Sequence, residues 1–255
     1  MSGATVAPDG CGHELALADP RSALGGLCQV WGDHRGVPGM SRIVAVMGSG
    51  ETSPTMVKLH RELMDRVGPP AVVLDTPFGF QENVEELTAK AVTYFRESVG
   101  RPIGVASWRA AATASTLETE TMLARLREAN YVFAGPGSPS YALRNWRAAP
   151  VREVLAEKLS RHGAVVFASA AALTLGRFTI PVYEIYKVGE DPHWLEGLDL
   201  LGLVGLVVAV VPHFDNAEGG THDTRYCYMG ERRLRMLEAQ LPREAFVLGS
   251  DEHTA

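Results

Sequence analysis

The residues with the clearest chemical potential are a serine, a histidine and a pair of acids. Ser169 ends one apolar run and precedes three alanines, His213 closely follows a second run, and Asp251 and Glu252 follow a third. A hydroxyl, an imidazole and a carboxylate can act together as nucleophile, general base and orienting group. Their order along the chain therefore points to acyl-transfer chemistry at Ser169.

A simpler interpretation of Ser169 is structural. An apolar run that changes into an Ala-Leu pattern indicates a buried strand that turns sharply into a helix, and a hydroxyl at that point can merely cap the helix. A histidine after a strand is likewise often structural. Chemistry is favoured because these polar residues follow the carboxyl ends of strands, where α/β sheets bind their ligands.

The elements that must position these residues alternate regularly along the chain. Short apolar runs predict strands, and apolar residues at helical spacing predict helices between them. The strands are expected at 43–47, 71–75, 103–106, 131–134, 165–168, 206–211 and 246–249. Residues 180–205 show little helical pattern and predict a hairpin or a connecting loop. The alternation predicts an α/β fold with a mainly parallel sheet covered on both faces.

Two glycine turns follow predicted strands. Gly48 and Gly50 invite a phosphate-loop interpretation, but the turn lacks the third glycine of the dinucleotide fingerprint and the Gly-Lys-Ser/Thr of a Walker loop. A plain tight turn is the simpler expectation. The turn at 135–139 contains two prolines, which donate no amide hydrogen, and leaves the amide of Gly137 free to face an oxyanion.

Composition excludes several classes of partner. The 255 residues carry a formal net charge of −6, and no basic cluster suits a nucleic acid. The apolar run at 198–211 is interrupted by Asp199 and by glycines, so it is too short to span a membrane. Cys11, Cys28 and Cys227 form neither a disulfide framework nor a Cys-x-x-Cys pair. We therefore predict a reducing, cytoplasmic location, and no motif indicates a cofactor.

Residues 1–39 differ from the rest of the chain. They are rich in Gly, Pro, Ala and Asp, show no sustained period and carry no basic-then-apolar signal pattern. Met40 directly precedes the first predicted strand. We expect either a disordered extension over 1–39 or a start of translation at Met40, followed by one α/β hydrolase-like domain over 40–255.

The turn at 135–138, the stretch 167–171 and the segments 212–217, 221–222 and 249–252 occur in an order found in one known family. They resemble the peptidase E and cyanophycinase family of serine hydrolases, in which a Gly-Gly-Gly-Asn-type turn precedes a Gly-x-Ser-Ala-Gly nucleophile elbow. The similarity extends from about Met40 to the end of the chain. It implies the three-layer α/β/α sandwich of the class I glutamine amidotransferases.

The resemblance assigns roles to single residues. It makes Ser169 the nucleophile, His213 the general base and Glu252 the acid that orients the histidine. The amides of Gly137 and Ala170 would form the oxyanion hole. The implied reaction is the hydrolysis of an amide through an acyl-enzyme.

The sequence departs from the family at three of these positions. Phe167 and Ala171 stand where the family has the two glycines of its elbow, and Ser138 stands where it has the asparagine of the turn. Relatives continue beyond the residue that matches Glu252 with further strands. We therefore expect either that the natural chain extends past Ala255 or that the edge of its sheet is short.

The resemblance also implies a substrate class, a small peptide or amide with an acidic residue near the bond that is cut. Arg225 is the candidate clamp for a carboxylate, because a guanidinium binds a carboxylate through two hydrogen bonds. Ser138, Asn216 and His222 are the other candidate substrate-binding residues, and a homodimer is left open as the assembly.

Three alternatives remain. A catalytically silent binding domain would keep the pocket without turnover. A glutamine amidotransferase would need a cysteine in place of Ser169. His213, His222, Asp223 and Asp215 are residue types that suit zinc or manganese, but a polar loop explains them more simply, and we predict no metal.

Overall fold

The centre of the protein is a parallel sheet of five strands. The computed structural model describes residues 40–255, so the extension predicted over 1–39 lies outside it. The strands follow the order β1-β5-β4-β2-β3, and every neighbouring pair is parallel. Their bounds are β1 Arg42–Met47, β2 Ala71–Leu74, β3 Gly104–Ala106, β4 Tyr131–Ala134 and β5 Gly163–Ala168. The predicted α/β fold is confirmed.

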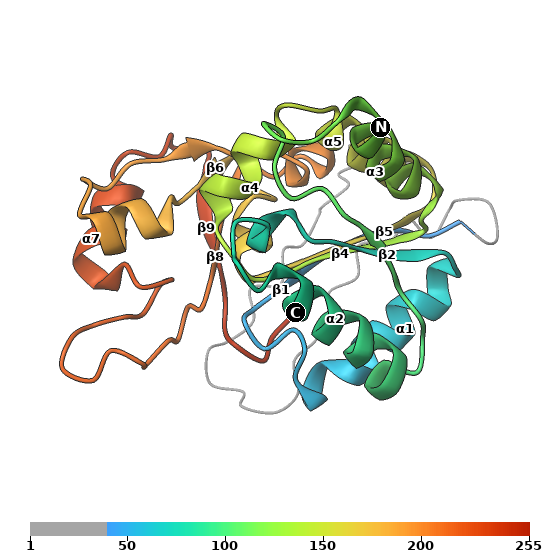
Figure 1. Ribbon diagram of the computed structural model, residues 1–255. Coiled ribbons are helices and arrows are strands. Elements are labelled where there is room, and N and C mark those ends of the chain that lie inside the picture. The colour runs from blue at the N-terminus through green and yellow to red at the C-terminus, as the bar shows by residue number, and fades with distance from the viewer. Residues whose placement is uncertain (1–39) are drawn as a thin grey trace, which may run out of the picture.

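Helices cover both faces of this sheet and make it the middle of three layers (Figure 1). One face carries α1 Val57–Val67, α2 Val84–Tyr94 and the π-helical turn η3 Phe95–Val99, and the other carries α3 Thr116–Glu128, α4 Pro139–Trp146 and α5 Val151–Arg161. Short 3₁₀ turns, η1 Pro54–Met56 and η2 Thr76–Phe78, connect strands to helices. Within residues 40–255 no helix combines the length and the apolar character needed to cross a membrane.

Both faces are buried because side chains alternate along each strand. In β5, Val165 and Phe167 pack under α3, α4 and α5, whereas Val166 and Ala168 pack against the α1 layer. All four side chains are fully buried. Since β5 lies between β1 and β4, the point where it ends at Ser169 is held by strands on both sides.

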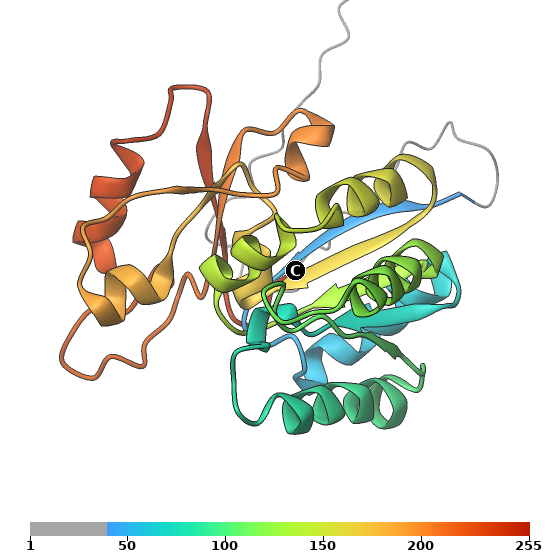
Figure 2. The same ribbon diagram turned by 45° about the horizontal axis from the view of Figure 1, so that its top comes forward.

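The C-terminal third of the chain adds a second sheet that the sequence did not separate from the first. Its order is β7-β6-β8-β9, with β6 and β7 antiparallel and the other pairs parallel. The elements are α6 Ser169–Leu173, β6 Phe178–Thr179, β7 Leu195–Glu196, β8 Val208–Pro212, α7 Gly230–Glu238 and β9 Phe246–Ser250. Figure 2 shows α7 and this sheet to one side of the three layers.

The connection predicted at 180–205 is not a plain hairpin. It contains a π-helical turn, η4 Glu184–Val188, and a 3₁₀ turn, η5 Leu201–Val204. Ile185 and Leu201 are buried, in different apolar clusters, so packing against the rest of the protein accompanies these short turns. Their apolar residues are too few to produce a helical period in the sequence.

The residues after β9 return to the carboxyl end of β1, as the red trace in Figure 1 shows. The amide of Gly48 donates to Thr254 O at 3.0 Å, and the amide of Gly50 donates to Glu252 O at 2.8 Å. A Cβ at position 48 would lie 1.8 Å from Asp251 O. The turn at Gly48 and Gly50 is therefore a tight turn, as expected. Because Gly48 has no side chain, the segment that carries Glu252 can pack directly against it.

We expect Gly48→Ala to destabilise the protein, because the new methyl group would push the backbone of Asp251 away. The cost should be about 1–3 kcal/mol, the usual range for overpacking. Gly104→Ala is the matched control, since a Cβ there would meet its nearest neighbour, Ala71 O, at an ordinary 3.6 Å. Thermal unfolding of both variants is the measurement, and equal midpoints would contradict this account of the turn.

Candidate active site

Ser169 stands at the junction of β5 and α6 with a backbone that L-residues rarely adopt. Its φ is 49°, in the left-handed region, where a residue with a Cβ is strained by about 1–2 kcal/mol. The amide of Ser169 donates to Gly48 O at 3.1 Å, and the amide of Ala171 donates to Gly135 O at 3.2 Å. The ends of β1 and β4 thus hold the serine turn in place.

The hydroxyl of Ser169 and the imidazole of His213 meet. Ser169 Oγ and His213 Nε2 lie 2.9 Å apart. His213 follows β8 and also has a positive φ, 52°. Its carbonyl accepts a hydrogen bond from the amide of Cys227 at 3.1 Å. The pairing predicted from the sequence is present, although the two residues come from different sheets.

The surroundings of His213 favour the neutral imidazole that a general base requires. Burial, the largest influence, lowers the pKa of His213 below its ordinary value of 6.5. The carboxylates of Glu218, Glu252 and Asp215 act in the opposite direction, in that order. At neutral pH the imidazole can therefore accept a proton, and nearby negative charge can stabilise the imidazolium that results.

Ser169 and His213 open into a cavity of about 480 Å³. Its wall also contains Gly137, Ala170 and three tyrosines, Tyr183, Tyr186 and Tyr228. The volume suits a small ligand rather than a folded protein chain. Further polar lining residues are Lys187, Glu218, His222 and Thr224.

The amides of Gly137 and Ala170 are the two that the sequence proposes for an oxyanion hole, and this role stays a prediction. The neighbouring amides are already used, because Ser138 N donates to Pro77 O at 2.8 Å and Ala171 N donates to Gly135 O. Gly137 has a φ of 137°, and a Cβ there would lie 2.0 Å from Pro77 O. Only glycine fits this point of the turn.

The two departures from the family motif are accommodated around Ser169. Phe167 is fully buried and packs on Trp146, with ring centroids 5.6 Å apart, in the cluster under α3–α5. Ala171 is also fully buried in that cluster. Neither side chain lines the cavity. Ser169 therefore reaches its positive φ with phenylalanine and alanine at these positions.

Glu252 is near the site but does not contact His213 directly. Its amide donates to Asp215 Oδ1 at 3.2 Å, while its side chain is 60% exposed and lies 3.9 Å from His253 Nε2. Within residues 40–255 no hydrogen bond joins the Glu252 carboxylate to His213. The backbone of Glu252 is fixed on both sides, whereas the role of its carboxylate stays a prediction.

Of the predicted substrate-binding residues, only His222 lines the cavity. Its Nε2 lies 3.3 Å from Tyr186 Oη. Ser138 caps α4, since its hydroxyl accepts from the amide of Tyr141 at 3.2 Å. The side-chain amide of Asn216 donates to Thr224 O at 3.3 Å, which holds the loop after His213.

Arg225 does not line the cavity. It forms a two-pronged ion pair with Asp223, with both N···O distances 2.9 Å, and its guanidinium lies 3.7 Å from Glu231. The guanidinium of Arg225, which the sequence predicted would bind a substrate carboxylate, is thus paired with an acid of its own loop. Lys187 is the one lysine or arginine among the residues that line the cavity, and within residues 40–255 it forms no salt bridge.

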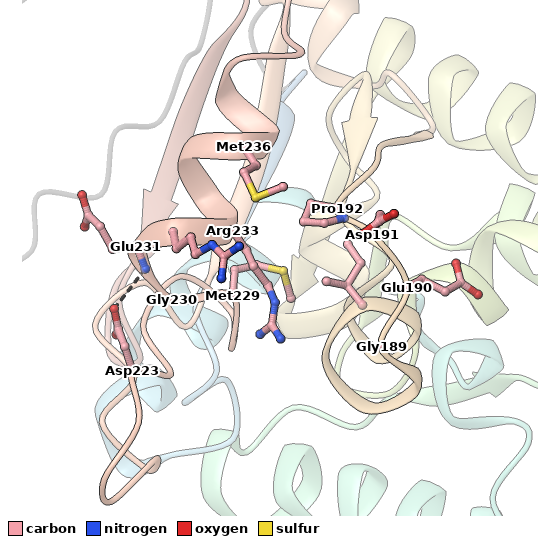
Figure 3. A pocket seen from close by; sticks show the side chains of 12 residues that line it. Gly189, Glu190, Asp191, Pro192, Asp223, Met229, Gly230, Glu231, Arg233 and Met236 are labelled. Atoms are coloured by element: carbon pink, nitrogen blue, oxygen red, sulfur yellow. Dashed lines mark hydrogen bonds between the residues drawn. The ribbon is translucent and has the colours of Figure 1, made fainter.

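A second cavity, of about 520 Å³, lies between the loop at 189–192 and the start of α7 (Figure 3). Asp223 lines it and accepts a hydrogen bond from the amide of Glu231 at 2.9 Å. Neither Ser169 nor His213 contributes to its wall. The described part of the chain, residues 40–255, contains no group of three or more His, Cys, Asp and Glu side chains arranged to bind a metal ion.

Sequence patterns did not single out several residues of the cavity. Glu218 is in the polar segment after His213 but carries no motif of its own, and its Oε2 accepts from Tyr228 Oη at 2.8 Å. The Tyr228 ring packs on His213 with centroids 5.8 Å apart. Lys187, Tyr183 and Tyr186 belong to the connection after β6, and only the tertiary fold brings this connection to the cavity at Ser169.

Comparison with known proteins adds evidence at the level of structure. No family model matches the chain, and no curated protein matches its sequence. A peptidase from an acI-B1 actinobacterium is similar with a TM-score of 0.63 and 18% identity, over 82% of this chain and 80% of that one. The chain has the fold of this peptidase. A candidate peptidase E protein from Listeria monocytogenes EGD-e is similar with a TM-score of 0.52 and 13% identity, over 82% of this chain and 90% of that one.

These similarities confirm, at the level of the fold, the resemblance seen in the sequence. The fold places Ser169 after β5, an inner strand of its sheet, at the carboxyl end where an α/β protein presents groups to a ligand.

The strain at Ser169 can be measured with two variants that both lack the hydroxyl. Ser169→Gly relieves the positive φ, whereas Ser169→Ala keeps it. We expect Ser169→Gly to be the more stable of the two by about 1 kcal/mol in the free energy of unfolding. Urea unfolding provides the comparison, and a more stable Ser169→Ala would show that the backbone at 169 is not strained.

Proposed function

We propose that this protein is a serine hydrolase that cleaves a small peptide or amide. The observation that carries the proposal is the 2.9 Å contact between Ser169 Oγ and His213 Nε2 at a strained strand-to-helix turn. The strain supports a functional role, because a serine that only capped a helix would not need this backbone. The peptidases with the same fold support the reaction class.

In the proposed reaction, Ser169 Oγ attacks the carbonyl carbon of the substrate while His213 Nε2 accepts the hydroxyl proton. The negative charge that forms on the carbonyl oxygen is held by the amides of Gly137 and Ala170. The C–N bond then breaks as His213 gives the proton to the leaving amine. A water molecule, activated by His213, hydrolyses the acyl-enzyme and restores Ser169.

We assign to Glu252 the role of the acid that orients His213. Its backbone is anchored through Asp215 and Gly50, which keeps the residue close to the site. Catalytic hydrogen bonds are often loose without substrate and tighten in the complex. Glu218 is the competing candidate, because it lines the cavity and is the acid with the largest effect on the pKa of His213.

The substrate should be small, as the cavity volume of about 480 Å³ indicates. The lining combines tyrosine rings with one lysine and one glutamate. Such a wall suits a short chain with polar ends, such as a peptide of a few residues or an amide of similar size. We place the reaction in the cytoplasm, following the prediction from the cysteine pattern.

An active-site-directed fluorophosphonate tests the nucleophile directly. We expect the wild-type protein to be labelled, Ser169→Ala to be unlabelled, and His213→Ala to react at least about 10²-fold more slowly, since a general base contributes this much. Ser160→Ala, at an exposed position of α5, is the control serine and should label normally. Labelling of Ser169→Ala at the wild-type rate would exclude Ser169 as the nucleophile, and tight ligand binding without labelling would favour a silent binding domain.

Two isosteric variants separate the candidate acids. If Glu252 orients His213, Glu252→Gln should slow labelling by about 10²-fold or more, because the base loses its orienting charge. Glu218→Gln should change the rate by less than about tenfold, since its carboxylate lies on the cavity wall and is bonded to Tyr228. The opposite order of effects would transfer the role to Glu218.

A further inference from the structure

Glu51 is a carboxyl group buried next to the proposed site, without a role in the reaction described above. Its side chain is only 5% exposed. Its Oε2 is buried and has no hydrogen-bond partner within the described residues 40–255. An unpaired buried carboxylate is costly, so a group in this position is expected to keep its proton.

The side chain of Glu51 reaches from one of the two turns that hold Ser169 toward the other. Glu51 itself belongs to the turn after β1, in which the carbonyl of Gly48 accepts a hydrogen bond from the amide of Ser169. Its Oε1 lies 3.6 Å from the point where a Cβ of Gly135 would be. Gly135 opens the turn that contains Gly137, and its carbonyl accepts the amide of Ala171. The carboxyl group is therefore packed beneath the oxyanion turn.

Within residues 40–255 no lysine or arginine forms a salt bridge with Glu51 or is among the groups that shift its pKa. His253 also packs near this turn, with its Nδ1 2.7 Å from the point where a Cβ of Gly50 would be. His60 uses both ring nitrogens, with Nδ1 2.6 Å from Tyr131 Oη and Nε2 2.7 Å from the backbone oxygen of Glu51. Burial lowers the pKa of His60 to about 4, so this histidine is neutral. Tyr94 and Glu252 also face the carboxyl group, and neither is a cation.

We propose that Glu51 is a positioning residue that supports the oxyanion turn as a neutral carboxylic acid, and that its ionisation slows acyl transfer. The inference rests on the proposed function, because it assigns the developing negative charge to the amide of Gly137. A carboxylate beneath that turn would repel this charge. It would also repel the nearby carboxylate of Glu252.

The electrostatic environment sets the pH at which this change occurs. Burial, the largest cause, raises the pKa of Glu51 to about 7, its own backbone amide opposes the shift, and the charge of Glu252 adds to it. The lowered pKa of His213 makes the base competent already below pH 6.5. The rate should therefore rise with pH below 6.5 and fall again as Glu51 ionises near pH 7.

The test is the rate of fluorophosphonate labelling between pH 5 and pH 9 for the wild type and Glu51→Gln, which keeps the shape but cannot ionise. We expect the wild-type labelling rate to fall by about tenfold above pH 7. The labelling rate of Glu51→Gln should rise with pH below 6.5 as in the wild type but should not fall above pH 7. Glu62→Gln, at an exposed position of α1, is the control and should follow the wild type. Coincident profiles of wild type and Glu51→Gln above pH 7 would overturn the proposal.

Thermal unfolding over the same pH range gives a readout that does not depend on activity. Since the folded-state pKa of Glu51 is raised from 4.5 to about 7, its contribution to stability is complete below about pH 4.5 and is lost as the pH rises through about 7. The unfolding midpoint of Glu51→Gln should therefore rise relative to that of the wild type as the pH is raised from 5 to 8. A constant difference would also overturn the proposal.

The two readouts separate the possible failures. A wild type that is not labelled at any pH refutes the proposed function, whereas labelling with identical pH profiles refutes the role of Glu51 alone. A pH-dependent stability difference without a change in the labelling profile would show a buried acid that does not act on the site, and it would overturn the proposal as well. If Glu51→Gln does not fold, Glu51→Leu repeats the test with an apolar side chain of similar volume.

Discussion

The left-handed backbone of Ser169 is the constraint on which the rest of the site depends. This conformation destabilises an L-residue by about 1–2 kcal/mol, so the surrounding structure must hold it. Two backbone hydrogen bonds do so, donated by the amide of Ser169 to Gly48 O and by the amide of Ala171 to Gly135 O. Both acceptors follow strands that flank β5, and the fully buried Phe167 and Ala168 anchor the strand itself. The fold therefore fixes the direction of a single hydroxyl.

The same strand order accounts for the other parts of the site. Because β1, β5 and β4 are neighbours, the turns that follow them contribute the buried Glu51, the serine and the amide of Gly137 at one edge. The second sheet brings His213 to Ser169 and returns Glu252 to the turn after β1. Glycine is required at Gly48 and Gly137 because backbone oxygens occupy the space of their side chains. Backbone packing, more than side-chain contacts, thus assembles the site.

The local patterns of the sequence were sufficient for the fold class, for the seven strands β1–β5, β8 and β9, and for the expectation that Ser169 and His213 meet. Each of these depends on apolar periodicity or on which end of a strand a residue follows. The second sheet was missed because β6 and β7 are only two residues long, too short for a period. Arg225 appeared free because its ion pair with Asp223 depends on loop geometry. The burial of Glu51 and the place of Lys187 on the cavity wall depend on distant segments, so no local pattern could predict them.

The central proposal is that Ser169 is an activated nucleophile that faces an oxyanion hole. A crystal structure of the fluorophosphonate-treated protein tests it most directly. The account predicts a covalent bond from phosphorus to Ser169 Oγ, with the phosphoryl oxygen about 3 Å from the amides of Gly137 and Ala170. An adduct on another residue, or a phosphoryl oxygen that points away from both amides, would contradict it.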